Sequence, residues 1–167
     1  MNDPEPKGLG VCIRGKVDDD YTADTVTRRS RTGYLTHVNC ALFHCFSKKQ
    51  ASVASNTFGL EFVAMKLCCE DIRGLRHELR MMGIPVEGPT CIEGENQSFL
   101  VNTTMPDSTL NKNNQRIAYH FTREGVARDE WRTTYVNTHE NEADLLTNGE
   151  KRKGFVRNLL HRVFRTS

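Results

Sequence analysis

The hydrophobic period of the chain changes near residue 60, and this change limits the possible folds more than any other feature. Apolar residues from Leu60 to Met82 recur at three- and four-residue steps, which predicts a long amphipathic helix that Gly83 ends. The preceding chain is rich in β-branched and aromatic residues, and it predicts three strands, near 11–17, 34–38 and 41–46. The chain therefore combines a meander of strands with a long helix.

Strand and helix patterns alternate in the rest of the chain. Short strands are predicted at 90–92 and 131–136, and a helix at 113–128 lies between them. Three apolar residues are expected to face inward from this helix: Ile117, Phe121 and Val126. The order predicts an α/β fold with a mixed five-stranded sheet, in which three antiparallel strands are followed by crossovers and helices flank the sheet.

Charge is distributed unevenly along the sequence. Residues 151–167 hold six basic residues and no acid, whereas the first 150 residues carry 17 basic and 21 acidic residues. An apolar stripe within 155–164 predicts a C-terminal helix whose polar face is basic. We expect residues 1–10, which contain two prolines and two glycines, to be a linker or lead-in, and residues 11–167 to form one domain.

Targeting and redox signals are absent from the sequence. It has neither a signal-peptide pattern nor an apolar run of membrane-spanning length, so we expect an intracellular protein of the cytoplasm or nucleus with no membrane partner. Six cysteines without a C-x-x-C spacing predict reduced thiols and argue against a zinc site.

Four acidic residues lie at the ends of predicted core elements: Asp18, Glu61, Glu95 and Asp144. Carboxylates that converge repel one another unless a cation lies between them. Magnesium prefers such hard oxygen ligands, and two ions can activate water and stabilise the leaving oxygen of a phosphodiester. From spacing alone, solvated surface charge is the alternative interpretation, because the chain has 21 acids.

Short blocks of sequence follow one another in order across residues 11–165. They include Val17-Asp18-Asp19-Asp20, Thr27-Arg28-Arg29-Ser30-Arg31-Thr32-Gly33-Tyr34, Phe46-Ser47-Lys48-Lys49-Gln50, Phe58-Gly59-Leu60-Glu61-Phe62-Val63-Ala64-Met65, Tyr119-His120-Phe121-Thr122-Arg123-Glu124 and Asn141-Glu142-Ala143-Asp144-Leu145-Leu146-Thr147. In this order the blocks resemble the ribonuclease H domain at the C-terminus of copia-type retrotransposon polyproteins. The resemblance implies a ribonuclease H-like fold that hydrolyses the RNA strand of an RNA–DNA hybrid with two Mg²⁺ ions, for which Mn²⁺ can substitute.

The resemblance also implies roles for the four acids. Asp18 would bridge both ions, and Glu61 and Asp144 would hold one each. Glu95 occupies the third catalytic position, where the family has Gly-Asp-Asn and this chain has Gly94-Glu95-Asn96. The added methylene leaves a second interpretation open: a catalytically impaired remnant of a copia-type polyprotein that acts at most as a nucleic-acid-binding fold.

Further residues are candidates for contacts with the hybrid or for product release. Substrate contacts are expected from Arg28, Arg29, Arg31, Asn96, Gln97 and Ser98. His139 lies where some ribonuclease H enzymes have a histidine that helps product leave, although a solvated loop histidine is the alternative. The family normally carries an upstream reverse transcriptase domain, which does not precede Met1, so we expect a detached terminal domain or a fragment.

Overall fold

The computed structural model describes residues 8–20, 30–49, 57–95 and 116–148. For residues 57–61 and 116 it describes the backbone alone. The lead-in expected at 1–10 is therefore described only from residue 8, and the basic helix expected after residue 148 lies outside the described residues.

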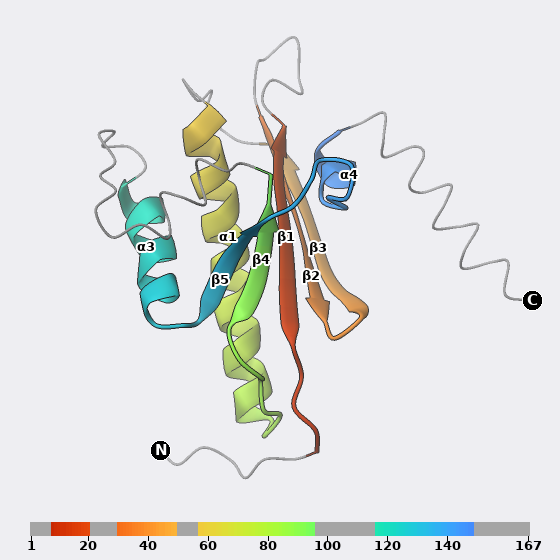
Figure 1. Cartoon of the computed structure of the whole chain (residues 1–167), viewed down its shortest axis with the longest axis vertical. Coiled ribbons are helices and arrows are strands. Elements are labelled where there is room, and N and C mark those ends of the chain that lie inside the picture. Colours follow the sequence, from red (N-terminus) through yellow and green to blue (C-terminus); the bar gives the residue numbers. More distant parts are fainter. Residues whose placement is uncertain (1–7, 21–29, 50–56, 96–115, 149–167) are drawn as a thin grey trace, which may run out of the picture.

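Five strands form one mixed sheet in the order β3-β2-β1-β4-β5 (Figure 1). They are β1 (Ile13–Asp20), β2 (Arg31–Val38), β3 (Ala41–Lys49), β4 (Thr90–Gly94) and β5 (Trp131–Tyr135). The pairs β1–β2 and β2–β3 are antiparallel, whereas β1–β4 and β4–β5 are parallel. The predicted fold class is confirmed, including the early antiparallel strands and the later crossovers.

The first strand ends in the acidic run Asp18-Asp19-Asp20, as the sequence pattern predicts. β1 continues through Asp20, which pairs with Arg31 of β2. The predicted hairpin between β2 and β3 is confirmed, and Asn39 adopts the positive φ of 55° that its tight turn requires.

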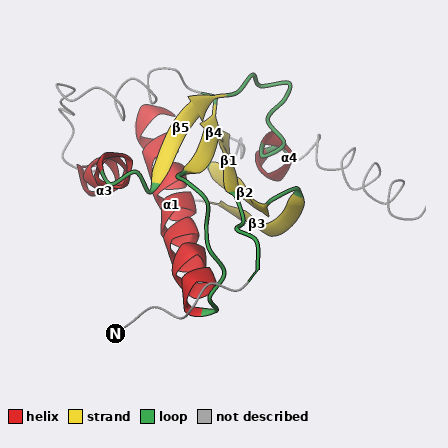
Figure 2. Cartoon of the chain, turned by 60° about the horizontal axis from the view of Figure 1, so that its bottom comes forward, coloured by secondary structure: helices red, strands yellow, loops and turns green. Residues whose placement is uncertain are grey.

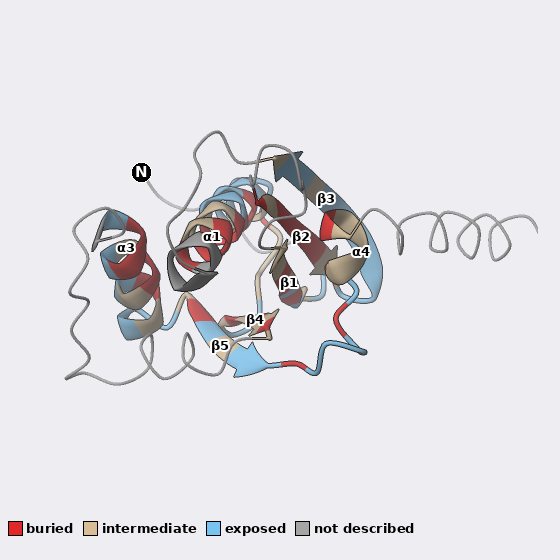
Figure 3. Ribbon diagram, turned by 90° about the horizontal axis from the view of Figure 1, so that it is seen from above, coloured by how far each residue is buried: buried red, intermediate tan, exposed pale blue. Residues whose placement is uncertain are grey.

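Helices cover the two faces of the sheet unequally. The long helix α1 (Thr57–Met81) and α3 (Arg116–Ala127) lie on one face, and the short α4 (Asp144–Thr147) lies on the other (Figures 2 and 3). Helix α1 ends as predicted, because Gly83 takes a φ of 77° and the next amide, of Ile84, donates to the carbonyl of Leu79 (2.9 Å). Among the described residues, no helix has the length and apolar character needed to cross a membrane.

The core lies between α1, α3 and the sheet. Phe62, Ile72, Ile92 and Trp131 are fully buried there. Trp131 also donates its indole N–H to the carbonyl of Thr122 (3.0 Å), so its one polar atom is satisfied inside the core. The core thereby fixes the positions of β1 and β4. The other side chains of these two strands project from the opposite face of the sheet, on which α4 lies.

One helix face differs from the prediction. Ile117 was expected to face inward, but it is 79% exposed, whereas Phe121 and Val126 are half-buried against the core. The buried stripe of α3 passes instead through Ala118, Tyr119, Thr122 and Gly125. Thr122 and Gly125 are polar or small, and hydrophobicity alone does not place them on a buried stripe.

Two helical glycines test this packing. A Cβ on Gly125 would lie 1.9 Å from Cζ2 of Trp131, whereas a Cβ on Gly74 in α1 would meet nothing within 4 Å. We expect Gly125→Ala to lower the free energy of unfolding by about 3 kcal/mol through overpacking. Gly74→Ala, the matched control, should raise it by about 0.5–1 kcal/mol. Urea denaturation measures both, and a Gly125→Ala protein as stable as the parent would contradict the packing.

Candidate active site at the carboxyl end of β1 and β4

Strand alternation and register bring Asp18 and Glu95 to one face of the sheet. In the parallel pair β1–β4, Lys16 is opposite Glu93. Asp18 lies two residues after Lys16 on β1, and Glu95 lies two residues after Glu93, just beyond the end of β4. Because side chains alternate between the two faces of a sheet, Asp18 and Glu95 lie on the same face and at the same level. This is the face that α4 covers (Figure 3).

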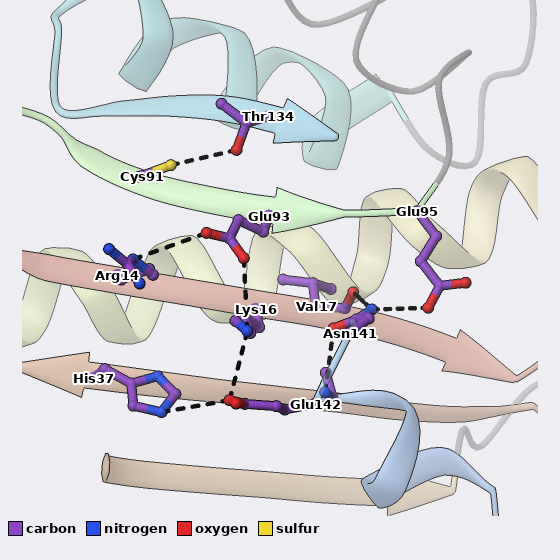
Figure 4. A network of polar contacts seen from close by, with 11 residues as sticks. Arg14, Lys16, Val17, His37, Cys91, Glu93, Glu95, Thr134, Asn141 and Glu142 are labelled. Atoms are coloured by element: carbon purple, nitrogen blue, oxygen red, sulfur yellow. Dashed lines mark hydrogen bonds and ion pairs between the residues drawn. The ribbon is translucent and has the colours of Figure 1, made fainter. Parts of the chain in front are cut away.

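Asn141 joins the two strands to the segment 137–148 that follows β5. Its side-chain amide donates to the carbonyl oxygen of Val17 and to Oε1 of Glu95, both at 3.0 Å. Its own carbonyl oxygen accepts from the backbone N–H of Ala143 (3.1 Å). Asn141 is 4% exposed, so every polar atom of this buried side chain has a partner (Figure 4).

Glu95 is held from two sides. In addition to Asn141 at Oε1, the hydroxyl of Thr138 donates to Oε2 at 2.8 Å. Both carboxylate oxygens therefore accept hydrogen bonds from the segment after β5. The longer glutamate side chain reaches across to that segment from the end of β4.

A charged network fixes the same segment to the sheet surface. Lys16 lies 3.8 Å from Glu93 and 3.5 Å from Glu142, and Glu142 is also 3.8 Å from Nε2 of His37 (Figure 4). The Lys16 side chain is largely buried, at 14% exposed. The network therefore ties β1, β2 and β4 to the residue next to Asn141.

Helix α4 begins at Asp144 and is pressed against β1 and β2. The hydroxyl of Thr147 donates to Oδ2 of Asp18. Gly33 of β2 makes this approach possible, because a Cβ there would lie 2.8 Å from Cβ of Leu146. Ser47 of β3 donates to the carbonyl of Leu146 at 2.7 Å. Asp144 is thus held at the same end of the sheet as Asp18.

The carboxylates at this end repel one another. Burial raises the pKa of Asp18 from 3.8 to about 6; the hydrogen bond from Thr147 opposes this shift, and the negative charges of Glu95 and Asp144 add to it. The three carboxylates are therefore close enough to interact electrostatically. A bound cation would relieve this repulsion, and carboxylate oxygens are the ligands that Mg²⁺ prefers, so the residues fit a divalent ion.

The fourth predicted acid, Glu61, lies on α1, and its side chain is not among the described ones. Within the described side chains, no group of three or more His, Cys, Asp or Glu is arranged to hold a metal ion by itself. The structure thus brings Asp18, Glu95 and Asp144 together and leaves the contribution of Glu61 as a prediction.

Of the predicted nucleic-acid contacts, Arg31 alone lies in the described part. It begins β2, beside Asp20, and donates to the hydroxyl of Ser47 at 3.3 Å. The others fall outside the described residues: Arg28, Arg29, Asn96, Gln97 and Ser98. His139 is exposed in the segment after β5, where its backbone N–H donates to the side chain of Asn137 (3.0 Å).

Sequence reasoning gave no role to the polar residues that hold the acids in place. Asn141, Thr138 and Thr147 contact Glu95 or Asp18, and only Asn141 had a signal, as the first residue of the Asn-x-x-Asp pattern that ends at Asp144. Lys48 was likewise given no role, although β3 pairs it with Thr32 at this end of the sheet.

The sequence of the chain is similar to parts of known proteins. No family model matches the chain. The retrovirus-related Pol polyprotein from transposon RE2 of Arabidopsis thaliana is 25% identical over 149 residues, which are 89% of this chain and 10% of the polyprotein. The corresponding polyprotein from transposon TNT 1-94 of Nicotiana tabacum is 26% identical over 148 residues, 89% of this chain and 11% of that protein. The chain spans about a tenth of these relatives.

Solved structures share the fold at low sequence identity. Ribonuclease H1 from Halobacterium salinarum has a TM-score of 0.62 at 15% identity, with 85% of this chain and 98% of that chain covered. LC11-RNase H1, solved in complex with an RNA/DNA hybrid, has a TM-score of 0.63 at 12% identity, with 86% and 99% covered. The chain has a ribonuclease H-like fold and is similar over most of its length to a part of retrotransposon Pol polyproteins. The predicted resemblance is confirmed.

A third structure links the ribonuclease H-like fold to a larger viral protein. The foamy viral protease-reverse transcriptase, in complex with an RNA/DNA hybrid, has a TM-score of 0.52 at 11% identity. The match covers 88% of this chain and 21% of the viral one. The ribonuclease H-like fold of this chain therefore corresponds to one part of that protein.

The raised pKa of Asp18 predicts how stability of this ribonuclease H-like chain depends on pH. The folded chain holds the Asp18 proton more tightly than the unfolded chain, so stability should fall as pH rises from about 4 to about 6. Without divalent ions, Asp18→Asn should therefore be more stable than the parent at pH 7, by about 1–2 kcal/mol after allowance for partial exposure. Thermal melts across this pH range measure the difference.

The matched control is Glu78→Gln on the exposed surface of α1. It should melt like the parent at each pH. An Asp18→Asn protein that is less stable than the parent at pH 7 would contradict the cost of a charged Asp18 at this buried position.

Proposed function

We propose that this chain is a metal-dependent endoribonuclease domain that hydrolyses the RNA strand of RNA–DNA hybrids. One observation carries the proposal: Asp18, Glu95 and Asp144 gather at one end of a ribonuclease H-like sheet, where burial first, and then the charges of Glu95 and Asp144, raise the pKa of Asp18. Carboxylates gathered in this way are costly for the fold and useful for binding cations.

The substrate class is supported by the relatives of the fold. Two of the similar structures, LC11-RNase H1 and the foamy viral protease-reverse transcriptase, were solved in complex with RNA/DNA hybrids. The transposon polyproteins also match almost the whole chain. We therefore assign the hybrid as substrate, and an upstream reverse transcriptase domain as the partner that would accompany this one in a polyprotein.

Two divalent ions, Mg²⁺ or Mn²⁺, are the proposed cofactors. Asp18 would contact both, while Glu61 and Asp144 would hold one each, with Glu95 as the fourth acid. When bound, such ions supply positive charge that activates water and stabilises the leaving oxygen of a phosphodiester. The hydrogen bond from Thr147 orients the Asp18 carboxylate, and the start of α4 carries Asp144 toward it.

The surroundings of the acids suit a phosphate backbone. Arg31 and Lys48 lie at this end of β2 and β3. Arg28 and Arg29 precede Arg31 in the sequence, and Asn96, Gln97 and Ser98 follow Glu95. We propose that these residues contact phosphates, sugars or bases without reading sequence, so that binding weakens as salt rises. His139, exposed in the segment between β5 and Asp144, is the proposed residue for product release.

A second candidate function rests on the contacts of Glu95. Both of its oxygens accept hydrogen bonds from the segment after β5, from Thr138 and Asn141. A carboxylate used in this way has fewer lone pairs free for an ion. The alternative is thus a nucleic-acid-binding fold in which Glu95 holds the segment after β5 and turnover is lost.

The deciding experiment is an assay of the purified chain with a labelled RNA–DNA hybrid, in Mg²⁺ and then in Mn²⁺. The parent should cleave the RNA strand, and Asp18→Asn should lower the rate by about 100-fold or more, because several kcal/mol of charge stabilisation are lost. Glu78→Gln is again the matched control and should cleave like the parent.

Glu95→Asp separates the two candidate functions. A parent that does not cleave, together with a Glu95→Asp variant that does, would favour the impaired fold and contradict the nuclease proposal for the natural sequence. Failure of both proteins to cleave, with hybrid binding retained in a filter assay, would favour the binding fold as well.

A further inference from the structure

A pocket of about 430 Å³ lies at the far end of α1 from the candidate active site. Four cationic or titratable residues of the helix line one wall: Arg73, Arg76, His77 and Arg80. Their spacing of three and four residues puts them on one helix face. Along the helix axis, Arg76 is about 22 Å from Glu61, at 1.5 Å per residue, so this pocket is separate from the acids.

The opposite wall is mainly apolar. Ile84, Pro85 and Val86 form it, and the one acid in the lining is Glu130. Glu130 is already paired, because its Oε2 lies 2.8 Å from Nε of Arg73. Three arginines against one glutamate leave the pocket with a net positive charge even when His77 is neutral.

The two inner arginines are held rigidly before any ligand arrives. Arg76 donates through Nη1 to the carbonyl of Gly88 (3.0 Å) and to the hydroxyl of Thr90 (3.2 Å). Burial lowers its pKa, which shows that part of its hydration has been removed. The guanidinium of Arg73 stacks 4.4 Å from the ring centroid of Phe121.

Arg73 also retains an unused donor. Among the described residues its buried Nη2 has no hydrogen-bond partner. A buried donor without a partner costs free energy. Guanidinium groups that are already held in place bind anions at a small entropic cost.

We propose that this pocket binds a phosphate ester about the size of one nucleotide. The arginine wall would hold the phosphate, because clustered guanidinium groups match its charge and oxygen geometry better than they match a single carboxylate. The apolar wall of Ile84, Pro85 and Val86 would cover the sugar or base. The volume falls in the range of ordinary small-molecule sites. The phosphate can come from a free ester or from the phosphorylated end of a nucleic-acid strand.

The test is a titration of the full ¹⁵N-labelled chain with ribose 5-phosphate, followed by NMR. We expect saturable shifts in the amides of residues 77–88 and in the indole of Trp131, the one tryptophan of the chain, whose ring centroid lies 5.1 Å from the Arg73 guanidinium. Arg80→Gln should weaken binding by about tenfold. Arg14→Gln, an equal loss of charge on the other face of the sheet, should bind like the parent.

Oligothymidylate with and without a 5′-phosphate separates the two sources. Shifts with the phosphorylated strand alone support a strand end, and shifts with ribose 5-phosphate but neither strand support a free ester. The proposal is overturned if neither probe shifts these signals at about 10 mM, where even a millimolar site is filled. It is also overturned if unphosphorylated ribose gives the same shifts, or if Arg80→Gln responds like the parent.

Discussion

The amide of Asn141 is the contact on which the candidate site depends. It joins β1 at Val17 and β4 at Glu95 to the segment that carries Asp144. The neighbouring strands β1 and β4 fix the positions of Asp18 and Glu95 only. The third acid, Asp144, lies on α4, a helix of four residues that has little stability of its own. The buried, fully bonded side chain of Asn141 therefore joins both strands to the start of α4, and the contacts of Thr147, Ser47 and Glu142 add to it.

The same end of the sheet shows a conflict between stability and function. Asp18 is buried beside two other carboxylates, which raises its pKa, and a neutral side chain there would serve the fold better. The hydrogen bond from Thr147 and the ion pair between Lys16 and Glu142 stabilise the surrounding structure, but they do not neutralise Asp18. Carboxylates kept together at this cost are expected where a cation is to be bound.

The parts of the fold with regular periodicity could be predicted from the sequence, and the contacts between elements could not. Runs of β-branched and aromatic residues predicted all five strands, and apolar residues spaced three to four apart predicted α1. Ile117 was placed wrongly because the buried stripe of α3 consists of residues such as Thr122 and Gly125, which carry no hydrophobic signal. Thr147 and Asn141 lie after β5, where no repeating pattern exists, and their contacts with Asp18 and Glu95 depend on how distant strands are aligned.

Paramagnetic broadening by Mn²⁺ in the NMR spectrum of the isolated chain tests the central claim most directly, because it detects ion binding independently of turnover. Substoichiometric Mn²⁺ should broaden the amide signals around Asp18, Glu95 and Asp144 before any others, and excess Mg²⁺ should restore them. Asp18→Asn should remove the effect. Signals at this end of the sheet that stay sharp while Mn²⁺ broadens another part of the chain, or none, would contradict the claim that these carboxylates form a cation site.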